Sequence, residues 1–152
     1  MIDFNTYQDL LALSFTWAEA YDLRNWELLR TILGDELDID YSNVFGGTLQ
    51  KMNREEFVAF ISGDHLLGKP NLKTHHLLGA HRFENLGDKT VGFYQIRAFH
   101  AMMDGEECTK QAVGSCTLEH AYAKIDNQWK LVGIKPGKIN EMSGNIQAIF
   151  AD

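Results

Sequence analysis

The sequence lacks the features that mark several classes of protein. Only two of its 152 residues are cysteine. Cys108 and Cys116 lie in one β-rich stretch, where extended chain would hold them too far apart to form a disulfide unless it turned back. No run approaches the 18 apolar residues of a membrane-spanning helix, and the N-terminus lacks the charged and apolar regions of a secretory signal. These absences predict a cytoplasmic protein in a reducing compartment.

Runs of basic residues and metal-binding patterns are also missing. The 14 lysine and arginine residues are scattered and the formal net charge is −7, so nucleic acid and anionic membrane surfaces are poor partners. His75 and His81 share a strand face but would lie about 20 Å apart, too far for one metal ion. No glycine-rich phosphate loop or Gly-x-Ser-x-Gly motif occurs. The sequence therefore predicts a protein that uses no metal and no organic cofactor.

The residues that are present have the pattern of one α+β domain spanning 1–152. An apolar content of 45% and a charged content of 23% are ordinary for a globular chain of this length. Helices are expected at 6–24, 25–33, 53–61 and 140–150. Strands are expected at 37–41, 72–84, 89–103, 109–126 and 128–135. Helices segregated from a long antiparallel run indicate a curved, cone-shaped sheet packed with helices, whose hollow could hold a ligand.

Two of the expected helices begin with the spacing of a capping box. Thr6 precedes Asp9 by three residues, and Asn53 precedes Glu56 by three. In this arrangement the first side chain accepts a hydrogen bond from a backbone N–H of the helix, and the second side chain bonds back. We therefore place helix starts at Thr6 and Asn53.

Alternation along the strands indicates which polar side chains point inward. His100 shares the more apolar face of its strand, and His76 is favoured over His75 because it shares a face with Leu72 and Leu78. The remaining inward candidates are Tyr21 and Asp22 on or beside the apolar stripe of the first helix, then Tyr41, Cys116, Leu118, His120 and Tyr122. Each alone could be a core residue with one hydrogen bond. Several titratable groups aimed into one interior must each be desolvated and partnered, which indicates a functional site.

Five stretches resemble a known family. They are Trp17-Ala18-Glu19-Ala20-Tyr21-Asp22, Ile39-Asp40-Tyr41, the Leu-Gly-x-Pro-x-Leu-x-Thr-x-His run from Leu67 to His76, Ile96-Arg97 with His100, and Lys135-Pro136. Over about 17–136 the chain resembles scytalone dehydratase, a fungal lyase of polyketide metabolism with the cone-shaped α+β barrel of the nuclear-transport-factor-2-like superfamily. The resemblance implies a homotrimer in which each subunit has its own cofactor-free site for a polyketide.

The resemblance also implies a role for each candidate residue. Tyr21 and Tyr41 would hold a water against the substrate carbonyl, His76 would be the general base, and His100 would pair with Asp22. The substrate would be contacted by Ala98, Cys116, Leu118, Ile134 and Phe150. The last expected helix, which carries Phe150, would form an apolar lid over the ligand.

Two residues depart from the family pattern. Where the family carries a serine and an asparagine that position substrate hydroxyls, this chain has Cys116 and Leu118, unless a shifted strand register brings Thr117 or His120 to that wall. The predicted function is therefore a lyase that dehydrates a β-hydroxy ketone other than scytalone. The alternatives are decarboxylation, isomerisation or cyclisation of a polyketide in the same pocket, or a non-catalytic ligand-binding module.

Overall fold

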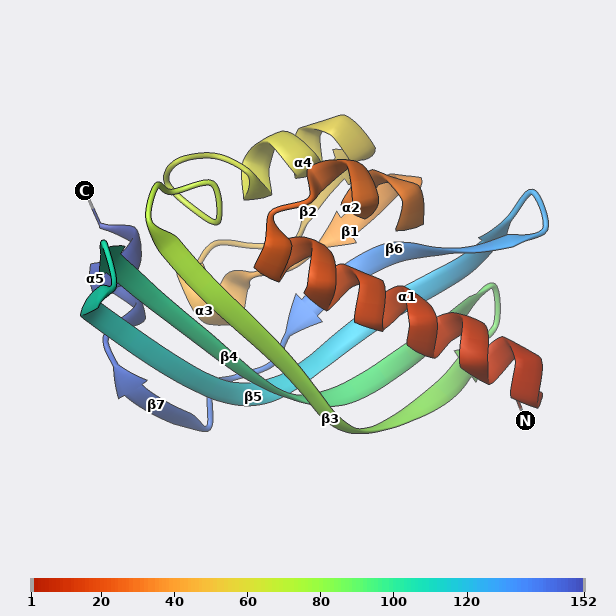
Figure 1. Cartoon of the computed structure of the whole chain (residues 1–152). Helices are drawn as coiled ribbons and strands as arrows, with labels where there is room; N and C mark the ends of the chain where they lie inside the picture. The colour runs from red at the N-terminus through yellow and green to blue at the C-terminus, as the bar shows by residue number, and fades with distance from the viewer. Residues whose placement is uncertain (1, 152) are drawn as a thin grey trace.

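The computed structural model describes residues 2–151, in which one strongly curved sheet wraps around a long helix (Figure 1). The helices are α1 (Phe4–Leu23), α2 (Trp26–Ile32), α3 (Ser42–Phe45), α4 (Arg54–Ile61) and α5 (Ile146–Phe150). The strands are β1 (Leu33–Ile39), β2 (Gln50–Asn53), β3 (Leu72–Leu86), β4 (Lys89–Asp104), β5 (Glu107–Ile125), β6 (Gln128–Pro136) and β7 (Glu141–Gly144). This arrangement confirms the predicted α+β fold.

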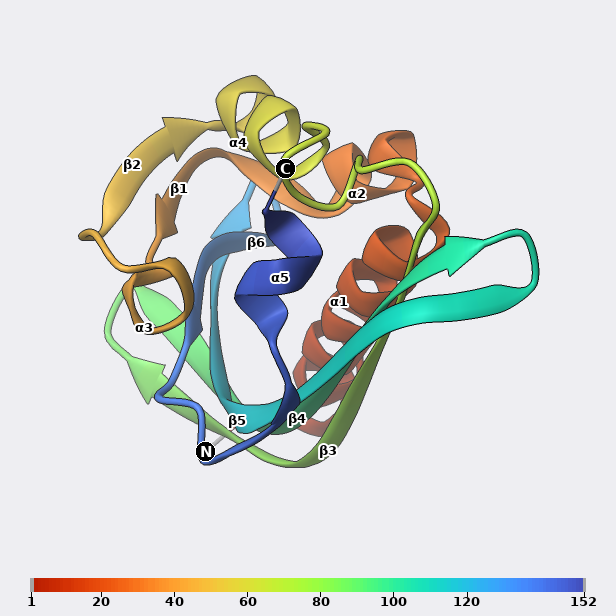
Figure 2. The same ribbon diagram turned by 90° about the vertical axis from the view of Figure 1, so that its left-hand side faces the viewer.

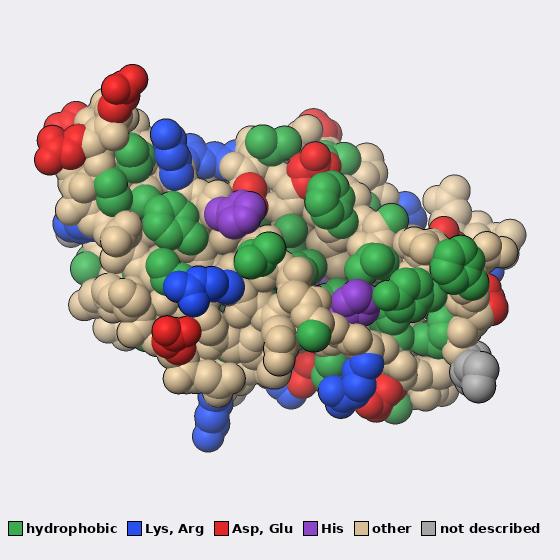
Figure 3. All heavy atoms as spheres, turned by 60° about the horizontal axis from the view of Figure 1, so that its bottom comes forward, with side chains coloured by type: hydrophobic (Ala, Val, Ile, Leu, Met, Phe, Trp, Pro, Cys, Tyr) green, Lys and Arg blue, Asp and Glu red, His purple; other side chains and the backbone are tan. Residues whose placement is uncertain are grey.

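The sheet runs in the order β2-β1-β6-β5-β4-β3, and β7 pairs with β5 outside this path. Strand β1 is parallel to β6, whereas the other pairs are antiparallel. Strand β3 therefore forms one edge of the sheet, and α1 packs beside it. The face seen in Figure 3 carries scattered hydrophobic side chains among charged ones. Leu77 of β3 is one of the exposed large hydrophobic residues.

The four long strands lie close to their predicted positions because each turn between them is specified by the residues of the turn itself. Asp126 and Asn127 both have positive φ angles, of 48° and 63°, as a two-residue hairpin turn that matches the strand twist requires. Gly87 and Gly105, in the other two hairpin turns, also have positive φ. A glycine adopts this conformation without a steric penalty.

The two helix starts that carry capping signals differ in outcome. Asn53 and Glu56 form the predicted capping box, with both reciprocal hydrogen bonds present. The prediction that Thr6 begins the first helix was wrong. Asp3 is the cap, and its carboxylate accepts hydrogen bonds from the backbone N–H and the hydroxyl of Thr6.

Two further elements differ from the prediction for identifiable reasons. Strand β1 begins at Leu33, four residues earlier than predicted. It ends at Ile39 because Asp40 accepts hydrogen bonds from the backbone N–H and the hydroxyl of Ser42, a local turn that starts α3. The predicted helix over 140–150 is instead strand β7 followed by the short helix α5. The reason lies at Gly144, whose φ of 78° is not a helical angle. A Cβ at this position would lie 2.1 Å from the backbone oxygen of Gln111, so only glycine allows β7 to approach β5 this closely.

The core fills the cone between α1 and the concave face of the sheet. Buried side chains of α1 recur three and four residues apart and include Leu10, Ser14, Trp17 and Tyr21, which is the spacing of one helix face. Within the described residues, no helix combines the length and apolar character needed to cross a membrane. Figure 2 looks into the wide end of the cone, where α5 lies across the opening.

Candidate active site

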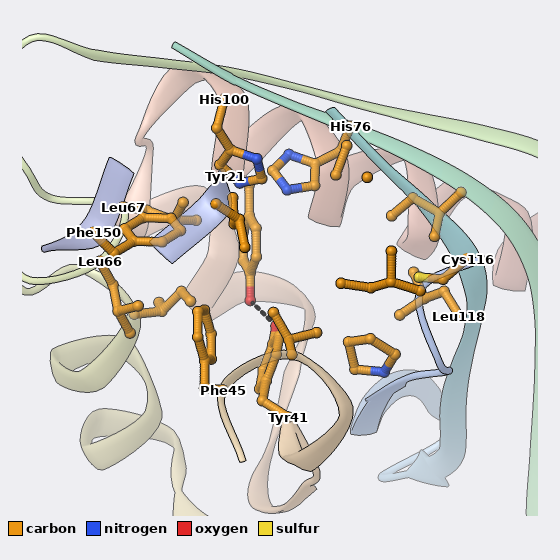
Figure 4. Close-up of a pocket in the computed structure, with 18 of the residues that line it drawn as sticks. Tyr21, Tyr41, Phe45, Leu66, Leu67, His76, His100, Cys116, Leu118 and Phe150 are labelled. Carbon is orange, nitrogen blue, oxygen red and sulfur yellow. Dashed lines mark hydrogen bonds between the residues drawn. The ribbon is translucent and has the colours of Figure 1, made fainter. Parts of the chain in front are cut away.

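A pocket under α5 collects the candidate residues from elements far apart in the sequence (Figure 4). Its polar side chains come from α1, the segment after β1, β3 and β4, and they are Tyr21, Tyr41, His76 and His100. The parity prediction for β3 is confirmed, since the His76 side chain is 7% exposed and that of His75 is 69% exposed. The remaining walls are almost entirely apolar.

Asp22 and His76 form a dyad at the edge of the sheet. The Nδ1 of His76 lies 2.7 Å from Oδ1 of Asp22, and the backbone N–H of His76 donates to Oδ2 at 2.9 Å. Burial alone would raise the pKa of the Asp22 carboxyl, but hydrogen bonds from His76 and Thr74 outweigh burial and hold it below its ordinary value. Because an ionised carboxylate only accepts, His76 carries its hydrogen on Nδ1 and leaves Nε2 free to accept.

The expectation that His100 pairs with Asp22 was wrong. Asp22 bonds to His76 because β3 is the edge strand next to α1, so it presents both a ring nitrogen and a free backbone N–H there. His100 lies one strand further in, on β4, with its ring 5.6 Å from that of His76. Within residues 2–151 its Nδ1 has no hydrogen-bond partner. Burial, followed by the neighbouring His76, lowers the pKa of His100 to about 3, so its ring is neutral near pH 7.

Tyr21 and Tyr41 point at each other across the pocket, as the dashed line in Figure 4 shows. Their hydroxyl oxygens are 3.1 Å apart. Burial raises the pKa of Tyr21 well above its ordinary value and that of Tyr41 to about 12. Both phenols therefore keep their hydrogens at neutral pH. When one phenol donates to the other, the second still has a hydrogen to donate to an oxygen in the pocket.

The wall formed by β5 is apolar. Cys116 and Leu118 both line the pocket, and burial raises the pKa of the Cys116 thiol, which keeps it neutral. Thr117 is exposed, whereas the Nδ1 of His120 lies 2.6 Å from the hydroxyl of Ser14. The alternative in which a shifted register places Thr117 or His120 at this wall is therefore wrong.

Of the other predicted contacts, Ala98 and Phe150 line the pocket and Ile134 does not. Ile134 is 1% exposed in the hydrophobic core. On the same strand, Pro136, two residues further along, reaches the pocket instead. Asp22 also lies outside the lining, and its link to the pocket is its hydrogen bond with His76.

Several lining residues were missed by the sequence reasoning. Trp17 lies on the apolar stripe of α1, which was visible, but Leu66 and Leu67 lie in a turn between α4 and β3 that has no periodic signal. Phe45, from α3, packs its ring 5.8 Å from that of Phe150, which in turn lies 5.5 Å from His100. The short helix α5 therefore closes the pocket with an aromatic contact on each side.

The arrangement suits proton abstraction next to a carbonyl group. It combines a base oriented by a carboxylate, two phenolic donors and a neutral imidazole within apolar walls. Such walls exclude water and strengthen hydrogen bonds to charge that develops on an oxygen. Among residues 2–151, no three His, Cys, Asp or Glu side chains are grouped so that they could hold a metal ion.

Comparisons with known proteins find a matching family model and similar fungal proteins. The family model described as scytalone dehydratase matches residues 1–152. Scytalone dehydratase arp1 of Aspergillus fumigatus is 36% identical over 141 residues, 89% of this chain and 83% of that protein. Scytalone dehydratase of Colletotrichum orbiculare is 36% identical over 155 residues, 99% of this chain and 82% of that protein.

A solved structure shows the same fold at much lower identity. The type 2 hexachlorocyclohexane dehydrochlorinase LinA superposes with a TM-score of 0.73 at 17% identity, covering 97% of this chain and 94% of the other. The family model and the fungal relatives together show that the chain belongs to the scytalone dehydratase family.

Proposed function

We propose that this protein is a cofactor-independent lyase that dehydrates a β-hydroxy ketone of fungal polyketide metabolism. The observation that carries the proposal is the Asp22–His76 dyad, placed in the same apolar pocket as the Tyr21–Tyr41 pair. Membership of a family whose relatives are named dehydratases supports the reaction type. The pocket combines a base with oxygen-directed donors, the two groups that a carbon acid next to a ketone requires.

In the proposed reaction, Nε2 of His76 removes the proton from the carbon next to the substrate carbonyl. The electron pair of that C–H bond moves toward the carbonyl oxygen, which Tyr21 and Tyr41 stabilise by hydrogen bonding, directly or through a water. The electrons then return to form a carbon–carbon double bond as the bond to the β-hydroxyl breaks. The His76 imidazolium gives its proton to the departing hydroxyl, so one water leaves and His76 is regenerated.

His100 receives a different role from the one that the family resemblance implied. Because its ring is neutral and lines the pocket, it can hydrogen-bond an oxygen of the substrate. In this scheme Asp22 orients the ring of His76 and not that of His100. Protonated His100 would repel a protonated His76, so its low proton affinity favours the step in which His76 becomes charged.

A panel of hydroxylated aromatic polyketides, incubated with the purified protein and followed by mass spectrometry, tests this proposal. Loss of water from at least one compound, abolished in the His76→Ala variant, is the expected result. Loss of carbon dioxide, or a new isomer of unchanged mass, would assign the pocket to decarboxylation or to isomerisation and cyclisation. Tight binding of panel compounds with no conversion would instead support a non-catalytic ligand-binding module.

Turnover should not depend on a metal ion. Exhaustive dialysis against a chelator is expected to leave the dehydration rate unchanged, because His76 and the two phenols supply the proton transfer and the stabilisation of the oxygen. Adding back single divalent ions tests the opposite outcome. Loss of activity on chelation with recovery by one ion would show that a metal performs the step assigned here to Tyr21 and Tyr41.

The β5 wall should disfavour a substrate hydroxyl on that side. A hydroxyl facing Leu118 would be buried without a partner, which costs about 1–3 kcal/mol and corresponds to roughly a five- to hundredfold penalty. The unmodified protein is therefore expected to convert scytalone slowly, and Leu118→Asn, alone or with Cys116→Ser, to convert it faster. A matched Leu118→Met variant should give no gain. Rapid conversion by the unmodified protein would contradict this substrate assignment.

A further inference from the structure

Asp22 lies within reach of two consecutive histidines. His76 points into the pocket and His75 points to the outside of the sheet, because neighbouring side chains of a strand face opposite ways. Asp22 lies beside the edge of β3 rather than on either face, so both rings can approach its carboxylate. Its Oδ1 is 2.7 Å from Nδ1 of His76, and its Oδ2 is 3.6 Å from Nδ1 of His75.

Only one of the two contacts is a hydrogen bond. The separation of 3.6 Å between His75 and Asp22 is too long for one, and a small rotation of the carboxylate toward the outer face would shorten it. His75 is 69% exposed, so its ring is free to follow that rotation. Something must therefore keep the carboxylate turned toward the pocket.

Thr74 supplies a hydrogen bond that does not depend on His76. Its hydroxyl donates to Oδ1 of Asp22 at 2.9 Å, the same oxygen that faces the ring of His76. The other two donors to Asp22 are the ring and the backbone N–H of His76 itself. The ring can rotate away, and the backbone N–H holds only Oδ2, whereas the Thr74 bond holds Oδ1 on the inner side of the strand.

We propose that Thr74 is a positioning residue that determines which of the two histidines hydrogen-bonds to the Asp22 carboxylate. With the Thr74 bond in place, Asp22 fixes the Nδ1–H form of His76 and leaves Nε2 as the base. Without it, the carboxylate can rotate about the remaining bond from the backbone N–H of His76 to Oδ2, which brings Oδ2 closer to His75 and takes Oδ1 away from the ring of His76. The ring of His76 then loses its fixed tautomer. This inference deepens the proposed function, and it rests on His76 being the base for its effect on turnover.

Thr74→Val is the matched variant, because it keeps the branched shape and replaces the hydroxyl with a methyl group. Nitrogen-15 NMR of labelled histidine rings reports the tautomer and hydrogen bond of each imidazole without a substrate. In the unmodified protein the Nδ1–H of His76 should give a downfield, hydrogen-bonded resonance. In Thr74→Val we expect that signal to weaken and a hydrogen-bonded signal to appear at His75. Thr74→Ser, which restores a hydroxyl, should restore the original spectrum.

A double variant distinguishes competition between His75 and His76 for Asp22 from a simple loss of local structure. Thr74→Val combined with His75→Ala removes the competing ring, so the His76 resonance and turnover should recover part of the way. Turnover in Thr74→Val alone should fall by about tenfold through kcat, the usual scale for one hydrogen bond to a charged group. If Thr74→Val does not fold, Thr74→Ala is measured in the same way.

The two readouts distinguish failure of this inference from failure of the proposed function. An unchanged His76 signal in the folded variant, or no gain at His75, would overturn the role of Thr74 whatever the reaction is. Equal loss of the His76 signal in Thr74→Val and in the double variant would overturn the competition. If the spectra change as expected while dehydration is absent from the unmodified protein, Thr74 positions the dyad and the proposed dehydration is wrong.

Discussion

Replacing His76 with alanine is expected to lower turnover by at least about a hundredfold, the usual contribution of a positioned general base. The substitution removes the nitrogen that accepts the substrate proton and leaves the Asp22 carboxylate without its main partner. Binding should change much less, because the apolar walls and the two phenols that line the pocket remain. The measurement is kcat and KM for whichever panel compound loses water, with circular dichroism to confirm folding.

The neighbouring histidine is the matched control. His75→Ala changes the same residue type one position away, on the outer face of the same strand. Its turnover should stay within about twofold of the unmodified protein, which is well below the general-base effect. Equal losses from both substitutions would contradict the assignment of the base, and so would a loss confined to His75→Ala.

Acid is expected to unfold the protein through its two deeply buried histidines. Burial lowers the pKa of His120 to about 3, and burial followed by the neighbouring His76 does the same for His100. Both pKa values lie below about 6.5, the value of an unfolded histidine. As the pH falls, the unfolded chain therefore binds these protons first, and stability decreases between about pH 6.5 and pH 3.

The size of this effect is comparable to the stability of a small domain. Each histidine contributes about 1.4 kcal/mol per pH unit below its unfolded pKa. Together the two would cost about 5 kcal/mol near pH 4.5, and a domain of this kind has about 5–15 kcal/mol in total. Urea unfolding followed at a series of pH values should show a free energy of unfolding that falls steeply below pH 6.5.

A substitution at His120 tests the origin of that slope. Asparagine can keep a hydrogen bond to the Ser14 hydroxyl, which the Nδ1 of His120 makes, but it does not titrate. His120→Asn should therefore be less stable at pH 7 and lose stability about half as steeply in acid. The exposed His65 provides the control, since His65→Gln should leave the slope unchanged. An unchanged slope in His120→Asn would show that other groups cause the acid sensitivity.

The parts of the fold that were predictable are those specified by nearby residues. The capping box at Asn53, the turn at Asp126 and Asn127, and the alternation that turns His100 inward all follow from short-range pattern. The C-terminal segment was not predictable in this way. Its residues 141–144 pair with 112–115 of β5, and no local signal reveals a partner about thirty positions away.

The candidate site was also predictable only in part. Sequence parity and the family resemblance indicated Tyr21, Tyr41, His76 and His100, and the structure brings these four into one pocket. The partner of Asp22 could not be predicted, because it depends on which strand lies at the edge of the sheet next to α1. The homotrimer and the cytoplasmic location stay predictions.

The parallel pairing of β1 with β6 has a consequence for how the protein is made. Strand β1 leaves the ribosome well before its neighbour β6, which follows it by about ninety residues. Until β6 emerges, one side of β1 has no strand to pair with, and Tyr41, which follows β1, cannot take its place opposite Tyr21. Such distant pairings slow folding and leave apolar surface exposed during synthesis. A nascent chain truncated before β6 should therefore bind chaperones, and the pocket that holds Tyr21 and Tyr41 should form only after β6 has emerged.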